Sequence, residues 1–548
     1  MEAWDVLVLG GTLEGMRSAI AAHDAGSNVA IISSSGLGDS NICHFNSGIA
    51  APINEDTTQG HRDDTIRSGK WLCDQDIVSI RVSSALNHIS QLETWGLNFR
   101  RDVEGLPFTE HSFGHKSARI TTTGDTTARQ LQNTLEEQCI KRGISRRGDY
   151  FVLCFVATSN QINGVVALDM NEGKIVPIQC KTLIVADGGF ESAWNITGSF
   201  GRGMQLAMEQ GIGLKNMEFQ SWSPLYVSDN KTSLPLTLIG NGGNIVTSSG
   251  ENYDVDFSST SNDICIKMLE SGNNFGINGK TIDEETETWF SSTKSLLSNR
   301  FGLSLSEDII PIRMSLESTI GGIPVDENCR VIINEWNRWF TGLYAVGDAA
   351  CSGIHGASIA SGNRILDSIS GGALAGEHAS KWATETEFSG SNNVNDEFEK
   401  FSKFIDEQLL DEAEGKTLRS RAIHTQLAEI MENSMGLSRD GGSLSTSIKS
   451  LNKLHQSLSD VRLDDTSMVM NQDLVNKLQL EGLLKLSIAA LKAAISREES
   501  RGGHLRTDFP EMDNNKFLKH SMSNAEDDVK WLPIRKSQSG NWILSPEL

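Results

Sequence analysis

The sequence predicts an α/β fold in which a parallel sheet is interrupted by an inserted lobe and followed by a helical C-terminal region. Three observations predict it. A strand, a glycine turn, a helix and a second strand follow one another at the N-terminus, two later strand-like runs end in glycine and aspartate, and helical spacing dominates after residue 396. A chain of 548 residues is long enough for about three or four structural units.

Composition excludes several classes of protein. Acidic residues outnumber basic residues by 71 to 48, and the net charge of −23 is the wrong sign for binding nucleic acid or anionic lipid along a whole surface, although a local basic pocket stays compatible with it. The eight cysteines form no Cys-x-x-Cys pair, so we expect reduced thiols and no iron–sulfur cluster or structural zinc held by this chain alone. The first apolar run begins at Val6 and no apolar run reaches 18 residues, so we expect no leader and a soluble, cytoplasmic protein.

The N-terminal segment carries an imperfect dinucleotide-binding fingerprint. A buried strand over residues 5–9 leads into a glycine turn, a helix follows over 16–25, and a second strand is expected over 28–32. Gly10 and Gly15 fill the first and third positions of Gly-x-Gly-x-x-Gly, but the second falls on Thr12, whose Cβ would slightly crowd a phosphate. A plain structural turn is the alternative interpretation of this motif taken alone.

Two later segments repeat the pattern of strand, glycine and acid. Residues 182–186 run into Asp187-Gly-Gly189, and residues 342–346 run into Gly347-Asp348. Since the carboxyl ends of parallel strands share one edge of a sheet, we expect the three segments to deliver backbone and carboxylates to one crevice. Asp348 would suit a ribose hydroxyl, and a helix N-cap is the alternative role for it.

The remaining chain divides by composition. Residues 225–317 are rich in Ser, Asn, Gly and Thr with short apolar runs, as expected of an inserted lobe, and residues 384–396 resemble a linker. Helical spacing is strongest over 398–410, 418–431 and 474–497.

Over nearly its whole length the chain resembles the flavoprotein subunit of succinate dehydrogenase and fumarate reductase, together with the relatives L-aspartate oxidase and the adenylylsulfate reductase flavoprotein. The blocks that carry the resemblance, besides the N-terminal strand, are Lys116-Ser-Ala-Arg119, residues 121–127 and 203–219, Gly321-Gly-Ile-Pro324, and residues 342–367 and 499–510. The resemblance implies a Rossmann-like FAD-binding domain over 1–224 and 318–385, a capping domain over 225–317, a linker over 386–396, a C-terminal helical domain over 397–505 and a tail segment over 506–548.

The resemblance also implies which residues lie beside FAD. They are Gly10, Gly11 and Gly15 at the pyrophosphate, Ser33 at the adenosine ribose, His355 beneath the isoalloxazine, and Arg119, Asp125, Asp348, Asn363 and Leu366 elsewhere along the cofactor. For His355 a buried structural histidine is an equal alternative. Asn41 stands where respiratory members have the histidine that holds FAD covalently, so we expect non-covalent FAD; His44 is a remote substitute.

The substrate positions of the family are changed. The resemblance aligns Ser223-Pro-Leu-Tyr226 with a His-Pro-Thr-Gly block, Glu317 with a histidine and Ile359 with an arginine, and Arg364 is a partial substitute for the last. Lys267 aligns loosely with the arginine that moves the proton in the cap; a solvated surface lysine is the alternative. Glu317 would be a surface residue if the alignment slips.

By resemblance we expect an FAD-dependent oxidoreductase that exchanges a hydride with its substrate while Lys267 moves the proton, with an iron–sulfur subunit as partner and membrane contact only through partner subunits. A carboxylate at Glu317 makes succinate a doubtful substrate, since two carboxylates about 4 Å apart repel by roughly 4 kcal/mol at an effective dielectric of 20. The alternatives are a neutral, cationic or nucleotide-like substrate, for which Trp222 could stack on a ring, or a catalytically silent subunit.

Overall fold

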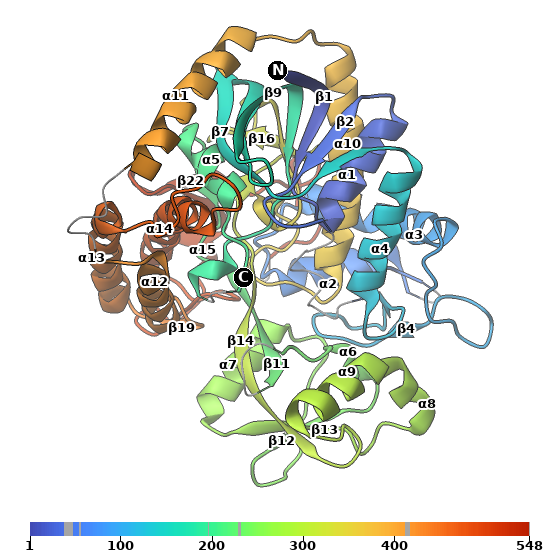
Figure 1. Ribbon diagram of the computed structural model, residues 1–548. Helices are drawn as coiled ribbons and strands as arrows, with labels where there is room; N and C mark the ends of the chain where they lie inside the picture. Colours follow the sequence, from blue (N-terminus) through green and yellow to red (C-terminus); the bar gives the residue numbers. More distant parts are fainter. Residues whose placement is uncertain (38–47, 54–55, 195–196, 228–231, 411–416, 547–548) are drawn as a thin grey trace.

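A computed structural model describes residues 1–37, 48–53, 56–194, 197–227, 232–410 and 417–546 (Figure 1). At its centre a parallel sheet is formed by strands from distant parts of the chain. The strands β1 (Glu2–Leu9), β2 (Val29–Ile32), β9 (Lys174–Val185) and β17 (Trp339–Ala345) lie in the order β17-β9-β1-β2, and β6 (Ser145–Arg147) follows β2.

The register brings the carboxyl ends of three strands level. Leu9 pairs with Val185, and Val185 pairs with Ala345. The turns that follow β1, β9 and β17 therefore open at one edge of the sheet, as the repeated strand, glycine and acid pattern predicts. This confirms the α/β class.

Alternate residues of β1 face two different cores, because successive side chains of a strand point to opposite faces. Val6 and Val8 pack with α1 (Leu13–Asp24), α3 (Gln75–Thr94), α4 (Thr127–Lys141) and α10 (Asn363–Thr384). Leu7 and Leu9 pack with α5 (Arg202–Glu209) and with the C-terminal helices α12 (Ser420–Ser434) and α14 (Gln472–Ser496). The helical C-terminal region thus covers one face of the sheet.

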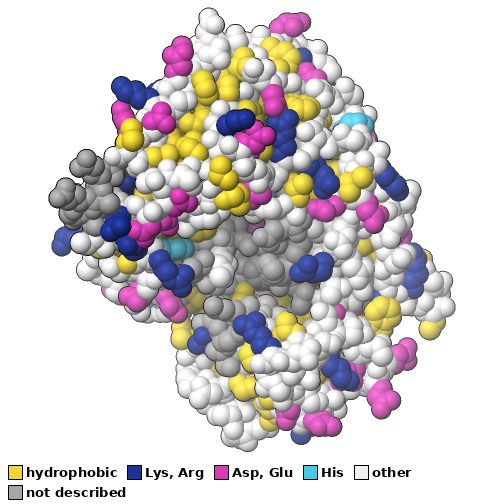
Figure 2. Space-filling model, viewed as in Figure 1, with side chains coloured by type: hydrophobic (Ala, Val, Ile, Leu, Met, Phe, Trp, Pro, Cys, Tyr) yellow, Lys and Arg dark blue, Asp and Glu magenta, His cyan; other side chains and the backbone are white. Residues whose placement is uncertain are grey.

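The inserted lobe hangs below the body of the molecule in Figure 1 and has its own core. Its sheet has the order β11 (Gln220–Val227), β14 (Ile309–Thr319), β13 (Phe275–Asn278) and β12 (Asn244–Thr247), with α7 (Ser261–Ser271) packed on β11. The expected boundaries at 224/225 and 317/318 fall inside the paired strands β11 and β14. The lobe is therefore joined to the body by continuous strands, and Figure 2 shows a hollow between the two parts.

Two helices differ from the sequence prediction. The expected linker 386–396 is shorter, because α11 (Ser391–Leu410) begins within it and packs on β7 (Tyr150–Thr158), β8 (Gln161–Asp169) and β9. Helix α13 (Gly441–Gln456) was not predicted, although Asp440 caps it and Leu444, Ile448 and Leu451 have helical spacing. The Ser and Lys residues between these apolar positions weaken the helical pattern in the sequence.

The tail returns to the first domain. The strands β21 (Lys519–Ser523) and β22 (Lys530–Pro533) form a sheet with β10 (Leu214–Lys215). Among the described residues no helix has the length and apolarity needed to cross a membrane. The other elements are α2 (Thr58–Ser68), α6 (Thr237–Gly240), α8 (Glu284–Glu287), α9 (Ser291–Leu296), α15 (Asn514–Phe517), β3 (Ile49–Ala50), β4 (Thr109–Glu110), β5 (Ile120–Thr121), β15 (Ile323–Pro324), β16 (Arg330–Ile332), β18 (Ala350–Cys351), β19 (Ser438–Arg439), β20 (Leu505–Arg506) and the short helices η2 (Glu191–Ala193), η3 (Thr288–Phe290), η4 (Leu297–Phe301), η5 (Gly347–Ala349) and η6 (Ser457–Asp460).

Candidate cofactor and substrate site

The glycine turn after β1 has the geometry that a close backbone approach requires. Gly10 has a φ of +119°, and a Cβ there would lie 2.1 Å from the carbonyl oxygen of Ala186. A Cβ on Gly11 would meet only the Ser33 side chain at 3.7 Å, so a ligand can reach the backbone at this point. Gly15 serves packing instead, because its Cβ would lie 2.1 Å from the Gly10 carbonyl oxygen.

Thr12 does not crowd this turn. Its hydroxyl donates to the Ala186 carbonyl oxygen at 2.8 Å and accepts from the Gly15 N–H at 3.2 Å. It therefore caps α1 and ties the helix to the end of β9. The second glycine of the fingerprint is replaced by a residue that fixes the start of the helix.

A crevice of about 290 Å³ opens at this edge of the sheet. Its walls include the turn residues Gly10 to Thr12, the serines that follow β2, Asp187 after β9, and one side of α14; the full set is Gly10, Gly11, Thr12, Ser33, Ser34, Ser35, Asp187, Gly198, Ser199, Phe200, Gly201, Arg202, Gln472, Asn476 and Gln479. The glycine cradle and the hydroxyls of the serines fit the pyrophosphate and ribose of a dinucleotide.

Asp187 supplies an unused acceptor in the crevice. Its Oδ2 accepts a hydrogen bond from the Gly203 N–H at 2.7 Å, while its buried Oδ1 has no hydrogen-bond partner. Burial raises the pKa of this carboxyl to about 6. A buried acceptor without a partner is costly unless a ligand supplies one, so Asp187 also fits a ribose hydroxyl. These contacts together fit the nucleotide half of FAD.

Asp348 lies in η5, after β17, where it pairs with Arg364 rather than capping a helix. Both its carboxylate oxygens accept from Arg364 Nε at 3.0 Å. Burial lowers the pKa of the Arg364 guanidinium, but the neighbouring Asp348 carboxylate raises it more, so the pKa lies above its ordinary value. Arg364 is thus a bound cation on the first turn of α10.

Further carboxyl groups surround this pair. Burial and the neighbouring Asp348 raise the pKa of Glu14 to about 8, and the same two causes raise the pKa of Glu191. Glu317 of β14 is partly buried and accepts a hydrogen bond from the Ser221 hydroxyl at 3.3 Å. Burial raises its pKa, although Arg364 acts in the opposite direction. Glu317 therefore lies beside the charged cluster and not on the surface.

The other two residues expected to carry chemistry lie differently. Ser223 of β11 is buried, and its hydroxyl accepts from the Leu225 N–H at 3.3 Å. Lys267 is exposed on α7, as in the alternative interpretation of a solvated lysine. Asn262 of α7 reaches the FAD-binding domain, where its Nδ2 donates to the Ser358 hydroxyl at 3.0 Å and to the Gln220 carbonyl oxygen at 3.1 Å.

The remaining expected cofactor residues have protein partners. Arg119 is buried between two carboxylates: its Nη2 lies 2.9 Å from Asp64 and its Nε lies 3.1 Å from Asp56, while its Nη1 has no hydrogen-bond partner. The amide oxygen of Asn363 accepts from His61 Nε2 at 2.8 Å and its Nδ2 donates to the Thr65 hydroxyl, which fixes the start of α10 on α2. Leu366 lies in the core beneath α1. The contacts that the structure shows for Asn363 and Leu366 therefore hold α10 in place.

Asp125 contacts the capping lobe, whereas His355 faces Asp367 inside the FAD-binding domain. The Asp125 carboxylate accepts from the Thr293 N–H of the capping lobe, and burial raises its pKa. His355 Nε2 lies 3.9 Å from Asp367, its Nδ1 has no hydrogen-bond partner, and burial lowers its pKa. A neutral histidine with an unused ring nitrogen is compatible both with a position beneath the isoalloxazine and with a buried structural role. Asn41 and His44 lie outside the described residues.

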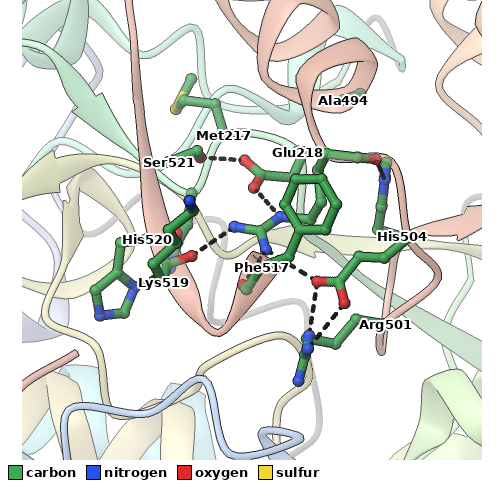
Figure 3. A network of polar contacts seen from close by, with 12 residues as sticks. Met217, Glu218, Ala494, Arg501, His504, Phe517, Lys519, His520 and Ser521 are labelled. Carbon is green, nitrogen blue, oxygen red and sulfur yellow. Dashed lines mark hydrogen bonds and ion pairs between the residues drawn. The ribbon is translucent and has the colours of Figure 1, made fainter. Parts of the chain in front are cut away.

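A buried ionic network supports the site from the C-terminal side, and sequence reasoning did not identify it (Figure 3). Arg497 pairs with Glu218 at 2.7 Å and with Glu499 at 3.0 Å, and Arg501 pairs with Glu499 at 2.8 Å. Ser521 donates to the other oxygen of Glu218 at 2.6 Å. Arg497 and Ser521 therefore hold the segment that leads into β11, and Glu499 of the block 499–510 bonds to Arg497.

Known protein families match this chain over most of its length. Residues 5–365 match the family described as FAD binding domain, and residues 424–539 match the family described as fumarate reductase flavoprotein C-term. The chain is 27% identical over 587 residues to the fumarate reductase flavoprotein subunit of Haemophilus influenzae, covering 99% of this chain and 96% of that protein. It is 28% identical over 564 residues to the Escherichia coli protein of the same name, covering 96% and 92%.

Solved structures share the fold. A quinol-fumarate reductase with menaquinol molecules superposes with a TM-score of 0.90 at 24% identity and covers 100% of both chains. Adenylylsulfate reductase from Archaeoglobus fulgidus superposes with a TM-score of 0.79 at 16% identity, covering 99% of this chain and 97% of that one. The expected Rossmann-like FAD-binding domain, cap and helical C-terminal region are thereby confirmed, and the chain belongs to the family of FAD-dependent oxidoreductases that contains the succinate dehydrogenase and fumarate reductase flavoprotein subunits.

Proposed function

We propose that this flavoprotein oxidises or reduces a neutral or cationic substrate rather than a small dicarboxylate, and that it exchanges electrons with an iron–sulfur partner. The observation that carries the proposal is the charge cluster around Arg364. The cation that could bind a substrate carboxylate is held by both oxygens of Asp348, and Glu317 and Glu191 influence the same guanidinium.

The electrostatic cost for a dicarboxylate is large. Asp348 already balances the single charge of Arg364, so an ionised Glu317 leaves the cluster with an excess negative charge. A substrate carboxylate about 4 Å from Glu317 is repelled by roughly 4 kcal/mol at an effective dielectric of 20, which weakens binding by almost a thousandfold. A neutral or cationic group carries no such cost.

Glu317 is our candidate for the proton transfer. Bound FAD supplies a hydride donor or acceptor at its N5 atom. Because burial raises the pKa of Glu317, its carboxyl is better matched to proton transfer near neutral pH than an ordinary glutamate. Ser223, two residues beyond Ser221 on β11, would contribute shape rather than a proton, since it is buried and bonded to its own strand.

A proton-transfer role for Lys267 rests on the resemblance alone, and the exposure of its side chain weakens that role. For Lys267 to act, the cap would have to present this face of α7 to the flavin. We expect Lys267→Ala to change kcat less than about twofold, and Glu317→Gln to lower it by about a hundredfold, as loss of a general acid or base does. Steady-state kinetics with the identified substrate separate the two roles.

Anaerobic flavin spectroscopy tests the substrate class. We expect dithionite to bleach the yellow protein and millimolar succinate to leave it oxidised, while the uncharged diamide of succinate binds and perturbs the flavin spectrum. Glu317→Gln should strengthen succinate binding. Rapid bleaching of the wild-type protein by succinate would overturn the proposal. A protein that no neutral or cationic probe perturbs would instead support a silent subunit, which the exposure of Lys267 favours.

The iron–sulfur partner is supported by the helical C-terminal region. Its block 499–510 is buried at Glu499, Arg501 and His504 but ends in the exposed Phe509, and Met512 beyond it is also exposed. Apolar side chains at such an end suit a protein interface. Reduced protein should pass electrons to a three-cluster iron–sulfur protein in a stopped-flow experiment. Phe509→Ser should slow this transfer without changing flavin reduction by dithionite.

A further inference from the structure

One wall of the nucleotide crevice is made by the C-terminal helical region. Gln472, Asn476 and Gln479 of α14 line the same space as Gly10, Gly11 and Ser33. Their positions i, i+4 and i+7 place them on one face of the helix. The long helix thus closes the crevice opposite the glycine turn.

Helix α14 is held firmly in this position. Leu474, Val475 and Leu478 pack in the core beneath α11, and Leu480 and Leu483 pack in the core that covers the central sheet. Two apolar contacts on different sides fix the rotation of the helix. The amide face therefore points into the crevice as a consequence of packing.

The three amides are available to a ligand. In the described part of the chain their side chains make no hydrogen bond to another residue, whereas neighbouring polar side chains do. Arg202, which lines the same crevice, donates to the Val152 carbonyl oxygen at 2.9 Å, to the Leu153 carbonyl oxygen at 2.7 Å and to Gln205 at 2.6 Å. The guanidinium is committed to backbone and side-chain acceptors, so neutral donors remain for an anionic ligand.

Amides suit the adenosine half of a dinucleotide. Each one offers a carbonyl acceptor and two N–H donors, which match ribose hydroxyls, the edge of adenine and phosphate oxygens without adding charge. The volume of about 290 Å³ is at the lower end of ligand pockets, and a smaller space of about 120 Å³ shares the lining residues Phe200 and Asn476 with it.

We propose that Gln472, Asn476 and Gln479 bind the adenosine half of FAD, so that the C-terminal helical domain is a direct part of the cofactor site. The proposal rests on the family's cofactor and not on the substrate proposed above. It predicts that the order of α14 and the binding of FAD are coupled, because each amide that bonds to the nucleotide also restrains the helix.

Flavin titration of the deflavinated full-length chain tests the proposal. Asn476→Asp and Gln479→Glu keep shape and place an anion beside the pyrophosphate. The combined variant should weaken FAD and ADP binding by about tenfold or more and leave binding of FMN, which lacks the adenosine half, unchanged. Gln426→Glu is the matched control: this amide is exposed on α12 and outside the crevice, so FAD binding should not change.

Two outcomes would overturn the proposal. One is FAD and ADP binding within twofold of wild type in the combined variant. The other is an equal loss of FAD, ADP and FMN binding, which would trace the effect to the fold. The uncharged pair Asn476→Ala and Gln479→Ala, expected to weaken ADP binding by about threefold, separates lost hydrogen bonds from added charge. None of these results depends on which substrate the enzyme turns over.

Discussion

At the scale of single residues, the feature that sets this chain apart is the number of carboxyl groups around Arg364. Burial raises the pKa of three of them, Glu14, Glu191 and Glu317. The pKa of Glu14 rises to about 8, because its side chain is buried in the first turn of α1 and faces Asp348. Its position inside the glycine fingerprint places a titratable group directly behind the cofactor turn.

Glu14 should make stability depend on pH. Its folded pKa of about 8 exceeds the ordinary value of 4.5, so the folded state holds a proton that the unfolded state has lost. The group therefore stabilises least at high pH: its contribution is complete below pH 4.5 and is lost as pH rises through 8. The expected slope is at most about 1.4 kcal/mol per pH unit.

Glu14→Gln should remove this slope, and urea unfolding at several pH values between 5.5 and 8.5 measures it. The variant should gain stability relative to wild type as pH rises. Glu498→Gln, at an exposed residue paired with Lys516, is the control and should keep the wild-type slope. A wild-type slope in Glu14→Gln would contradict the assignment.

At the scale of elements, α7 connects the capping lobe to the body. In its first turn Asp263 pairs with Lys70, which follows α2, with charged atoms 2.9 Å apart, and Asn262 bonds to Ser358. Asp263 also closes the capping box of α7. The helix that starts with these residues therefore holds the lobe against the flavin side of the body.

Lys70→Met should loosen this contact while leaving the capping box intact. A partly exposed ion pair contributes up to about 1 kcal/mol, so hydrogen exchange in α7 should accelerate by up to about fivefold. Lys294→Met is the control, since Lys294 pairs with Glu287 inside the lobe. Equal acceleration in both variants would show that the contact between the lobes contributes nothing to the position of the cap.

At the scale of the whole molecule, the buried ionic network joins three parts of the chain that are far apart in sequence (Figure 3). Arg497, at the end of α14, donates to Glu218 ahead of β11 and to the backbone carbonyl oxygens of Phe517 and Lys519. Both partners of each ion pair are fully buried. Loss of the cation would leave Glu218 buried without an ion-pair partner, whereas Glu499 would keep its pairing with Arg501.

Arg497→Met should therefore destabilise the protein by about 3–5 kcal/mol, the cost of breaking a buried pair from one side. The midpoint of urea unfolding measures the change. Arg462→Met removes an exposed arginine that lies 3.2 Å from Asp464 and should change stability by less than about 1 kcal/mol. A small effect in Arg497→Met would mean that Glu218 and Glu499 find other partners or protonate.

The sequence by itself determined the central sheet, the glycine turn, the inserted lobe and most helices, because these follow from periodicity and from glycine, which act over a few residues. Only the tertiary structure decided which polar groups meet. Thr12 bonds to the end of β9, Asn262 rather than Lys267 reaches the body, and the amides of α14 face the first glycine turn. Each of these contacts joins residues tens to hundreds of positions apart, and their distance depends on how whole elements pack.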